Sequence, residues 1–303
     1  MHKNQNLHQA KSGKNDEFYT QLPDIEKELR HYEPHFKDKV VYCNCDDPQV
    51  SNFFKYFSSN FERLGLKKLL TSCYRNKDAG KRIEGVSDKA VWLEMSSPEN
   101  SSVHAFEGDG DFRSEEALAL LKQADIVVTN PPFSLFREYV AQLVAHDKQF
   151  LIIGNVNAIT YKEIFPLIKN NQMWLGDNTT RHFLQPDGSL YETARTFWYT
   201  NLDFAKRHED LVLCKLYNEK AYPKYDNYDA ININKATEIP MDYDGVMGVP
   251  ITFLGKYNPD QFEILGNLGS YAPDGYSLCG GIYIDGKKIF KRIVVRRNGE
   301  TYR

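Results

Sequence analysis

Short apolar runs alternate with amphipathic stretches through the first half of the chain. A helix is expected between Ser51, a suitable N-cap, and Gly65, and further helices after Ser114, after Ser134 and across residues 161–169. Because strands that alternate with helices form parallel sheets, the pattern predicts a doubly wound α/β sheet with helices on both faces. The predicted strands are residues 40–42, 69–70, 92–95, 103–106, 126–128 and 150–153.

The pattern changes after about residue 172, where Gly, Asn, Asp, Pro and Tyr become frequent. We therefore expect a larger first domain over residues 1–205 and a smaller β-rich region over residues 206–303. The strand-like pieces in this part of the chain are short and lie at residues 196–199, 212–216, 249–253, 282–284 and 293–295.

Three polar motifs come directly after predicted strands, at residues 43–48, 109–111 and 130–133. In an open α/β sheet, ligands bind in the crevice outside the carboxyl ends of the strands. The shared placement predicts that the three motifs meet at one rim of the sheet.

The motif Asn130-Pro131-Pro132-Phe133 offers a side-chain amide, a rigid turn and an aromatic ring at the end of a buried strand. Such a set can hold the exocyclic amine of a planar base. Bonds from the amine to the Asn130 side-chain oxygen and the Pro131 carbonyl would favour a tetrahedral nitrogen whose lone pair faces an electrophilic methyl group. Phe133 would stack on the base, which must leave a duplex to reach the site. The alternative is an ordinary strand-ending turn, since Asn-Pro and Pro-Pro are common breakers.

The first of the three motifs carries Asp46, Asp47 and Pro48 at a strand end. Carboxylates suit the ammonium group of a cofactor with a methionine moiety. The first amides of the following helix, near Ser51 and Asn52, suit the carboxylate of the same cofactor. The alternative is an Asp-Pro turn followed by a plain helix cap.

The loop of residues 108–112 supplies Asp109, Asp111 and Phe112. A carboxylate here could accept from the adenine amine of such a cofactor, with Phe112 stacked on its ring. The alternatives are a Gly-Asp turn or a metal loop, but the spacing of a calcium hand is not completed downstream, so no metal site is expected. Residues 15–20 form an aromatic and polar cluster that by itself indicates little beyond a helix start.

The composition indicates the class of protein and the compartment in which we expect it. With 303 residues, 41% hydrophobic and 26% charged, the chain is typical of a globular protein, and no apolar run reaches the roughly 20 residues of a membrane span. Five cysteines without a C-x-x-C pair favour a reduced, intracellular setting, which we expect to be the cytoplasm. The net charge of −3 argues against a nonspecific nucleic-acid coat.

The C-terminal segment is locally basic. Residues 287–303 contain seven Lys or Arg residues against one acid, Glu300. The segment is either a basic face for nucleic acid, with Arg296 and Arg297 as candidate contacts, or an edge strand guarded by its charges.

Taken together and in this order, residues 16–20, Asp47-Pro48 with Ser51, residues 108–112 and residues 130–133 resemble the amino-methyltransferases that use S-adenosylmethionine. The set is more closely similar to the EcoRI-type adenine-specific DNA methyltransferase family, and the similarity spans nearly the whole chain. It implies a Rossmann-like methyltransferase core that binds S-adenosylmethionine in residues 1–205, and a target-recognition region in residues 206–303. The implied cofactor-binding residues are Phe18, Tyr19, Thr20, Asp46, Asp47, Pro48, Asp109, Asp111 and Phe112, and the implied catalytic residues are Asn130, Pro131, Pro132 and Phe133.

The chain departs from the general methyltransferase pattern in two places. The usual glycine-rich donor loop is replaced by residues 47–53, which contain no glycine, so the backbone is less free to approach the donor. The strand ending near Thr71 also lacks the acid that normally holds the donor ribose. The EcoRI-type branch shares both departures.

The function that this resemblance implies is methylation of adenine in double-stranded DNA. The enzyme would be the protective half of a restriction–modification system, paired with a restriction endonuclease encoded elsewhere, or an orphan phage or bacterial enzyme. An RNA adenine methyltransferase differs only in substrate and stays open. A protein glutamine methyltransferase is the runner-up, but such enzymes typically carry Tyr in place of Phe133 and an intact glycine-rich loop. A DNA-binding module without activity is a further alternative, which tight S-adenosylmethionine binding would exclude.

Overall fold

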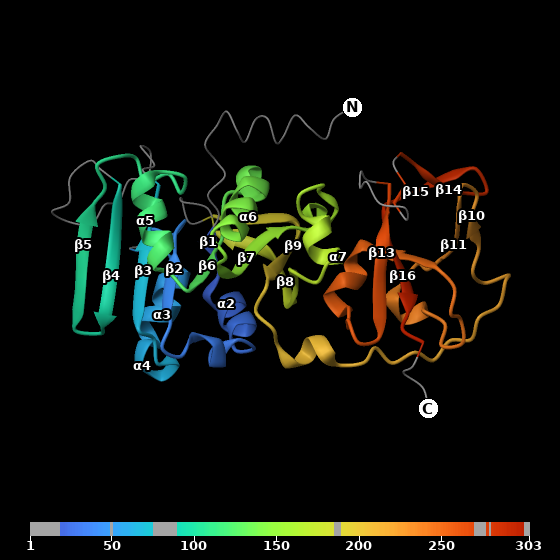
Figure 1. Ribbon diagram of the computed structural model, residues 1–303, viewed down its shortest axis with the longest axis horizontal. Coiled ribbons are helices and arrows are strands. Elements are labelled where there is room, and N and C mark those ends of the chain that lie inside the picture. The colour runs from blue at the N-terminus through green and yellow to red at the C-terminus, as the bar shows by residue number, and fades with distance from the viewer. Residues whose placement is uncertain are drawn as a thin grey trace. The chain divides into compact units, whose positions relative to one another are not determined.

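The computed structural model describes residues 19–48, 51–74, 90–184, 189–269, 277–278 and 280–299 (Figure 1). The chain divides into two compact units. The first comprises Met1–Asn155 and Asn178–Leu202, and the second comprises Val156–Asp177 and Asp203–Arg303. The assignment of residues 1–205 to catalysis and residues 206–303 to target recognition stays a prediction.

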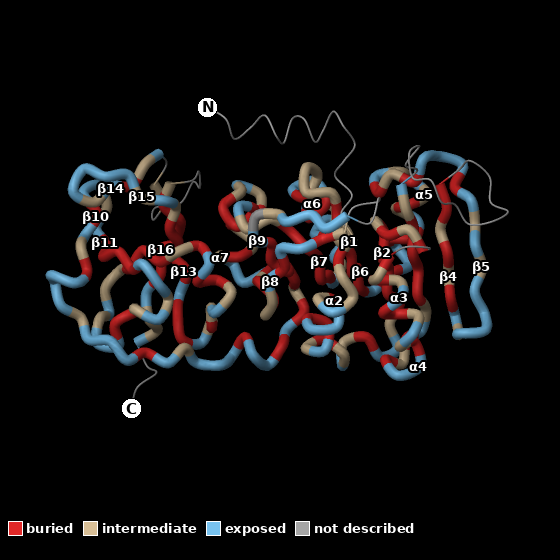
Figure 2. The backbone as a smooth tube through the Cα atoms, turned by 180° about the vertical axis from the view of Figure 1, so that it is seen from behind, coloured by how far each residue is buried: buried red, intermediate tan, exposed pale blue. Residues whose placement is uncertain are grey.

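The first unit is built on a nine-stranded sheet in the order β1-β8-β9-β7-β6-β2-β3-β4-β5. Its four central strands pair in parallel and are almost entirely buried (Figure 2). Continuous runs of Val, Ile and Leu suit strands that are covered on both faces. The predicted α/β class is therefore confirmed. The central strands are β7 (Gln149–Asn155), β6 (Ile126–Thr129), β2 (Val40–Cys43) and β3 (Lys68–Ser72).

The flanking strands pair antiparallel, so the prediction of a parallel sheet is wrong at both ends. The link between the predicted strands at residues 92–95 and 103–106 is a tight turn, too short for the crossover that a parallel pair requires. These strands form a hairpin whose outer member, β5, is largely exposed (Figure 2). The flanking strands are β4 (Val91–Ser97) and β5 (Asn100–Ala105) beside β3, and β9 (Leu190–Thr200), β8 (Trp174–Leu184) and β1 (Tyr19–Thr20) beyond β7.

Local signals set the outer helix ends as predicted, but the single helix expected between Ser51 and Gly65 is divided at Asn60 into α3 and α4. The Ser51 hydroxyl caps α3 (Asn52–Ser59), and the Ser114 hydroxyl caps α5 (Glu115–Gln123) by accepting the Ala117 amide. Gly65 ends α4 (Phe61–Leu64) with a φ of 63°. Other helices here are α2 (Leu22–Leu29), α6 (Phe136–Ala145) and the 3-10 turns η1 (Glu33–Phe36) and η2 (Phe133–Leu135). No helix among the described residues is long and apolar enough to cross a membrane.

The second unit contains a five-stranded sheet in the order β10-β11-β12-β16-β13 and a separate hairpin of β14 and β15. One apolar cluster on this sheet consists of Tyr225, Ala230, Leu265, Leu268, Ile282 and Val294. The strands are β10 (Lys224–Tyr225), β11 (Tyr228–Asn232), β12 (Met247–Pro250), β13 (Phe262–Leu268), β14 (Ile282–Ile284), β15 (Lys287–Ile289) and β16 (Arg292–Arg297). Short helical segments complete this description: η3 (Val156–Thr160), α7 (Phe165–Lys169), η4 (Ala205–His208), η5 (Ala236–Glu238) and η6 (Ile251–Lys256).

Two local predictions for this unit are wrong. The helix expected across residues 161–169 begins only at Phe165, because Pro166 belongs in a first helical turn. Residues 212–216 form no strand, and their Val212 and Leu216 side chains are exposed. Leu213 is buried, and Lys215 forms only an isolated bridge with Pro240, so the run is not extended into a strand.

The basic C-terminal strand is not an edge strand, which corrects that alternative. β16 lies between β12 and β13 and pairs antiparallel with both. Its Ile293, Val294 and Val295 side chains are fully buried, so packing rather than charge explains why this segment is a strand.

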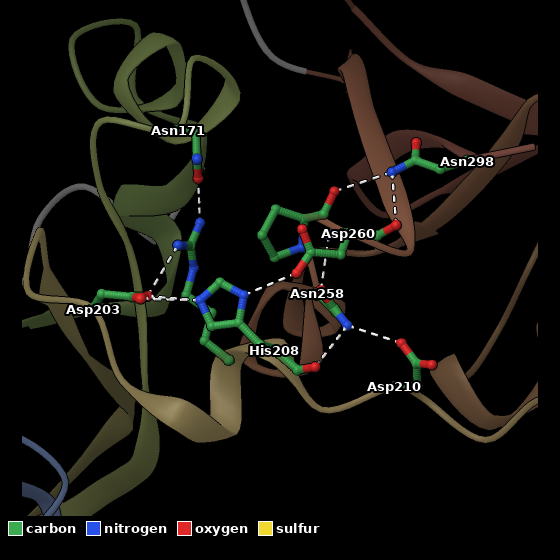
Figure 3. A network of polar contacts seen from close by, with 9 residues as sticks. Asn171, Asp203, His208, Asp210, Asn258, Asp260 and Asn298 are labelled. Atoms are coloured by element: carbon green, nitrogen blue, oxygen red, sulfur yellow. Dashed lines mark hydrogen bonds and ion pairs between the residues drawn. The ribbon is translucent and has the colours of Figure 1, made fainter. Parts of the chain in front are cut away.

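A polar network joins residues 203–210 of the second unit to residues 258–260, the loop before β13 (Figure 3). The His208 ring bonds to Asp260 through Nδ1 and to Asp203 through Nε2, both at 2.9 Å. The Asn258 side chain donates to the His208 carbonyl at 3.1 Å and to Asp210 at 3.0 Å. The hydrogen bonds to Asp260 and then to Asp203 raise the pKa of His208 above its ordinary value. An imidazolium between two carboxylates therefore clamps these segments together.

Replacing His208 with Gln should lower the stability of the chain in a pH-dependent way. The unfolded-state pKa of His is about 6.5 and the folded one is higher, so the contribution of His208 is complete below about pH 6.5 and is lost as pH rises through the raised pKa. Urea unfolding should show a larger gap between wild type and His208→Gln at pH 6 than at pH 9. His182→Gln, at an exposed position on β8, serves as the control. A gap of equal size at both pH values would contradict the clamp.

Candidate active site

The three polar motifs start from one edge of the first unit's sheet. β2, β3 and β6 are parallel, so their last residues, Cys43, Ser72 and Thr129, lie at the same rim. β5 runs in the direction of β3, because each is antiparallel to β4, and its last residue Ala105 pairs with Val91 at this rim. The common edge expected from the sequence is present.

Asp46 joins several of these strand ends. Its carboxylate accepts a hydrogen bond from the Ser51 hydroxyl at 2.7 Å and another from the Thr129 hydroxyl. Its backbone N–H donates to the Ser72 carbonyl at 3.0 Å, and the Thr71 hydroxyl donates to the Asp46 carbonyl at 2.7 Å. One residue therefore connects the end of β2 with β3, β6 and the N-cap of α3.

The Asp46 carboxylate is held by hydroxyl groups in a site that is 6% exposed. Burial raises the pKa of Asp46 to about 6, the hydrogen bonds from Thr129 and Ser51 act in the opposite direction, and the nearby Asp47 adds to the increase. Because a buried carboxylate is costly unless it is hydrogen-bonded, the two hydroxyls favour its ionised form.

The predicted catalytic residues follow Thr129 directly, so the bond from Thr129 to Asp46 fixes where their loop begins. Pro131 is buried, and Asn130, Pro132 and Phe133 are half-buried. The loop passes through the 3-10 turn η2 into α6, and α6 is thereby anchored to the same rim.

Phe183 links the catalytic loop to the N-terminal strand. It is fully buried on β8, and its ring meets the Phe133 ring edge-to-face with the centroids 6.2 Å apart. On β1, Thr20 is the register partner of Phe183, and the Asn52 side chain of α3 donates to the Thr20 carbonyl at 2.8 Å. Thr20, the start of α3 and the catalytic loop therefore lie next to one another. Phe18 is outside the described residues.

The loop of residues 108–112 lies tightly on the ends of β3 and β4. Gly110 has a φ of 75°, and a Cβ there would come within 2.5 Å of the Cys73 carbonyl oxygen, so only glycine fits. Phe112 is buried against Tyr139 of α6, with the ring centroids 5.1 Å apart and edge-to-face. The Gln142 side chain donates to the Phe112 carbonyl at 3.0 Å, which fastens the loop to α6.

The two acids of this loop differ in their surroundings. Asp111 forms an ion pair with Arg113 at 2.6 Å, and the Arg113 hydrogen bond holds the pKa of Asp111 below its ordinary value. Asp109 is exposed, and it accepts the Asp111 amide at 3.1 Å. Asp109 is therefore the more accessible carboxylate for a ligand at the rim.

A second buried bond joins α6 to the segment after β2. The Tyr139 hydroxyl donates to the Asn44 side-chain oxygen, and both residues are buried. Burial raises the pKa of Tyr139 well above its ordinary value, so the hydroxyl remains a neutral donor. Together with Asp46, this bond holds the segment after β2 against the catalytic loop and its helix.

The first amides of α3 are mostly used within the chain. The Ser51 amide donates to the Asp47 carbonyl at 2.8 Å, and the Phe53 and Phe54 amides donate to the Ser51 hydroxyl at 3.1 and 3.2 Å. A carboxylate ligand would have to use other donors. The other predicted cofactor residues of this region are partly or fully covered, with Pro48 buried and Tyr19 and Asp47 half-buried.

Sequence reasoning did not single out Thr129, Tyr139 or Phe183. A hydroxyl at the last position of a buried strand is a usable signal for Thr129. Tyr139 and Phe183 carry no such signal, because their partners are distant in the sequence. Within the part of the chain that the structure describes, no three Asp, Glu, His or Cys side chains are grouped as a metal ion would require.

A large mixed sheet within an α/β unit, whose central strand β6 leads into residues 130–133, is consistent with a methyltransferase fold. The family model described as "Adenine-specific methyltransferase EcoRI" matches residues 6–298. The chain belongs to this family, and it is accordingly a methyltransferase.

Named relatives agree with this assignment. The Type II methyltransferase M.EcoRI of Escherichia coli is 54% identical over 289 residues, which cover 86% of this chain and 89% of the relative. M.MgeORF184P of Mycoplasma genitalium is 38% identical, covering 87% and 86% of the two chains. M.MpnI of Mycoplasma pneumoniae is 37% identical, covering 96% and 98%. No solved structure matches the chain.

Replacing Thr129 with Val tests the bond to Asp46 while keeping the shape of the side chain. The loss of one hydroxyl leaves a buried carboxylate short of a donor, which should cost about 2 kcal/mol at pH 8. Since this bond lowers the pKa of Asp46, its loss moves that pKa further up, and the destabilisation should grow as pH rises from 5 to 8. Urea unfolding at the two pH values measures both effects.

Thr129→Ser is the matched control for this prediction, because it keeps the hydroxyl and loses only a methyl group. It should stay closer to wild type than Thr129→Val at pH 8. Equal losses in the two variants, without dependence on pH, would show that Thr129 acts by packing alone.

Proposed function

We propose that the protein transfers a methyl group from S-adenosylmethionine to the exocyclic amine of an adenine that has left double-stranded DNA. The observation that carries the proposal is the position of residues 130–133. The loop follows a buried central strand, and Thr129 bonds to the same Asp46 carboxylate that accepts the hydroxyl of Ser51, the N-cap of α3. The adenine specificity in the family description supports the choice of base.

The described side chains fit a donor with an ammonium group and an adenine ring. We assign the ammonium group to Asp47, which is half-buried beside Asp46, and the adenine amine to the exposed Asp109. Asp46, Asp111, Pro48 and Phe112 would shape the site from behind, because their contacts are within the protein. Tyr19 and Thr20 of β1, together with Phe18, are assigned to closing the site.

The donor group, when bound, supplies an electrophilic methyl group on a sulfonium. The chain's own task is to prepare the amine, which is a poor nucleophile because its lone pair is delocalised into the ring. Acceptance of the two N–H groups by the Asn130 side-chain oxygen and the Pro131 carbonyl favours a tetrahedral nitrogen. The lone pair then forms the N–C bond as the S–C bond breaks, and the extra proton on nitrogen passes to water. No metal and no covalent protein intermediate is required.

Phe133 is proposed to stack on the base after it has left the duplex. Its contact with Phe183 fixes the position of the ring before the base arrives, which lowers the cost of ordering the site. The names of the relatives support a role in a Type II restriction–modification system, as the protective partner of an endonuclease or as an orphan enzyme.

The proposed reaction predicts that Asn130→Ala lowers turnover by on the order of 10²-fold or more, because the acceptor acts on the amine where the new bond forms. Methyl transfer from labelled S-adenosylmethionine to unmethylated duplex DNA, followed by mass analysis of the nucleosides, measures this. The expected product is N6-methyladenine. Affinity for the donor and for DNA should change little.

Asn100→Ala, at the exposed first residue of β5, is the control and should leave turnover near wild type. Unchanged turnover in Asn130→Ala would remove this residue from the mechanism. Donor binding without any product on DNA would contradict DNA as the substrate and direct the search to RNA or protein.

A further inference from the structure

The β14–β15 hairpin is a small, firmly held element beside β10 and β11 of the second unit (Figure 1). Its turn consists of Asp285 and Gly286, whose φ values of 49° and 71° are those of a two-residue hairpin turn that requires left-handed residues. The Asp226 carboxylate accepts both turn amides, from Asp285 at 3.0 Å and from Gly286 at 2.8 Å. The Asn227 side chain also donates to the Gly281 carbonyl at 3.0 Å. The hairpin is therefore fixed in shape before any partner binds.

The two faces of the hairpin differ in character. Ile282 is fully buried in the apolar cluster, and its register partner Ile289 packs against the same cluster. On the other face Tyr283 is the register partner of Lys288, and Phe290 continues the outward alternation beyond β15. Phe290 is 61% exposed and Tyr283 is 36% exposed. An exposed aromatic face next to lysine is unusual for a surface that contacts only water.

The Tyr283 ring lies over Gly281, which has no side chain. A Cβ at Gly281 would be 2.7 Å from the Tyr283 hydroxyl oxygen, so the ring occupies that space. The aromatic group is thus laid down along its own strand rather than extended freely. A flat, preformed apolar surface of this kind costs little conformational entropy when a partner covers it.

Arg292, Arg296 and Arg297, the arginines of the basic C-terminal segment that the structure describes, are engaged within the second unit. Arg296 pairs with Glu263 at 2.8 Å, and Arg297 bonds to the Met241 carbonyl and lies 3.8 Å from Asp244. Arg292 is buried, and it donates to the Asn232 side chain at 3.1 Å. The sequence-based candidates Arg296 and Arg297 therefore have their charges partly neutralised by neighbouring acids.

Lys287 and Lys288 differ from these arginines. Both are exposed on β15, and neither forms an ion pair within 4.0 Å with any residue that the structure describes. Asp226, the nearby acid under the turn, is occupied by the two backbone amides. The exposed acid of the hairpin itself is Asp285 at its tip. Lys288 lies on the outward face with Tyr283 and Phe290, whereas Lys287 is the register partner of Ile284 on the opposite face and is exposed next to the turn.

We propose that the β14–β15 hairpin is a contact surface for double-stranded DNA, on which Lys287 and Lys288 bind backbone phosphates and Tyr283 and Phe290 lie against sugars or base edges. The proposal rests on the proposed function, which makes duplex DNA the substrate. Charge complementarity selects this partner, because lysines without acidic partners match phosphates and release their counterions on binding. The contact supplies affinity and orientation, whereas base sequence is read elsewhere or through Phe290.

The test compares DNA binding by the full-length chain across salt concentrations. The probe is an unmethylated duplex that wild type methylates, with affinity measured from about 50 to 200 mM salt. The Lys287→Ala/Lys288→Ala double variant should bind about tenfold more weakly at 100 mM salt and lose about 2 from the slope of log K against log salt. Lys220→Ala/Lys235→Ala changes the same charge at exposed positions of the same unit and should keep the wild-type slope.

Two single variants separate charge from apolar contact. Phe290→Ala should weaken binding severalfold while leaving the salt slope unchanged, because no phosphate contact is lost. Asp285→Asn removes the acid at the tip and keeps a residue that tolerates a positive φ, so it should strengthen binding two- to threefold. Unfolding midpoints equal to wild type would show that these exposed substitutions leave the fold intact.

The outcomes separate this inference from the proposed function. A wild-type chain that methylates duplex DNA, with an unchanged salt slope in Lys287→Ala/Lys288→Ala, would overturn the hairpin surface alone. A wild-type chain that binds no duplex DNA at any salt concentration would overturn the proposed function and the hairpin surface together.

Discussion

Two hydrogen bonds to one buried carboxylate hold the rim of the main sheet together. Asp46 receives the hydroxyls of Ser51 and Thr129, and its backbone is bonded to the end of β3. Any shift of the catalytic loop relative to α3 must break one of these bonds or carry the helix with it. Because the carboxylate is desolvated, losing either hydroxyl costs more than an exposed hydrogen bond would. The hydrogen bond from Tyr139 to Asn44 likewise holds α6 against the segment after β2.

This arrangement gives a physical account of a donor loop without glycine. A glycine-rich loop brings the backbone close to a ligand and leaves its amides available. Here the amides at the start of α3 bond to Asp47 and Ser51, and side chains take over the ordering of the loop. One glycine that the rim requires is Gly110, where a side chain would strike the end of β3. In the proposed function, donor recognition then depends on the carboxylates of Asp47 and Asp109 rather than on backbone amides.

The sequence predicted the features that depend on local chemistry. Buried central strands such as β2, β6 and β7 follow from their apolar runs, and the helix ends at Ser51, Gly65 and Ser114 follow from their caps. The placement of three polar motifs on one rim followed from the direction of the strands. Predictions failed where a tertiary partner decides the outcome. Residues 212–216 form no strand although their pattern is apolar, and the basic β16 lies inside a sheet. The contacts of Phe183 and Tyr139 could not be predicted from the sequence for the same reason, since their partners are brought close only by folding.

The most direct test of this account is a crystal structure of the chain with S-adenosylhomocysteine, the product of the proposed reaction. We expect its sulfur beside the Asn130 side chain and its ammonium group on Asp47, with Asp46 still bonded to Ser51 and Thr129. A ligand bound away from this rim would contradict the proposed site. An Asp46 side chain turned onto the ligand, with Thr129 released, would contradict the central claim that this carboxylate holds the two loops together.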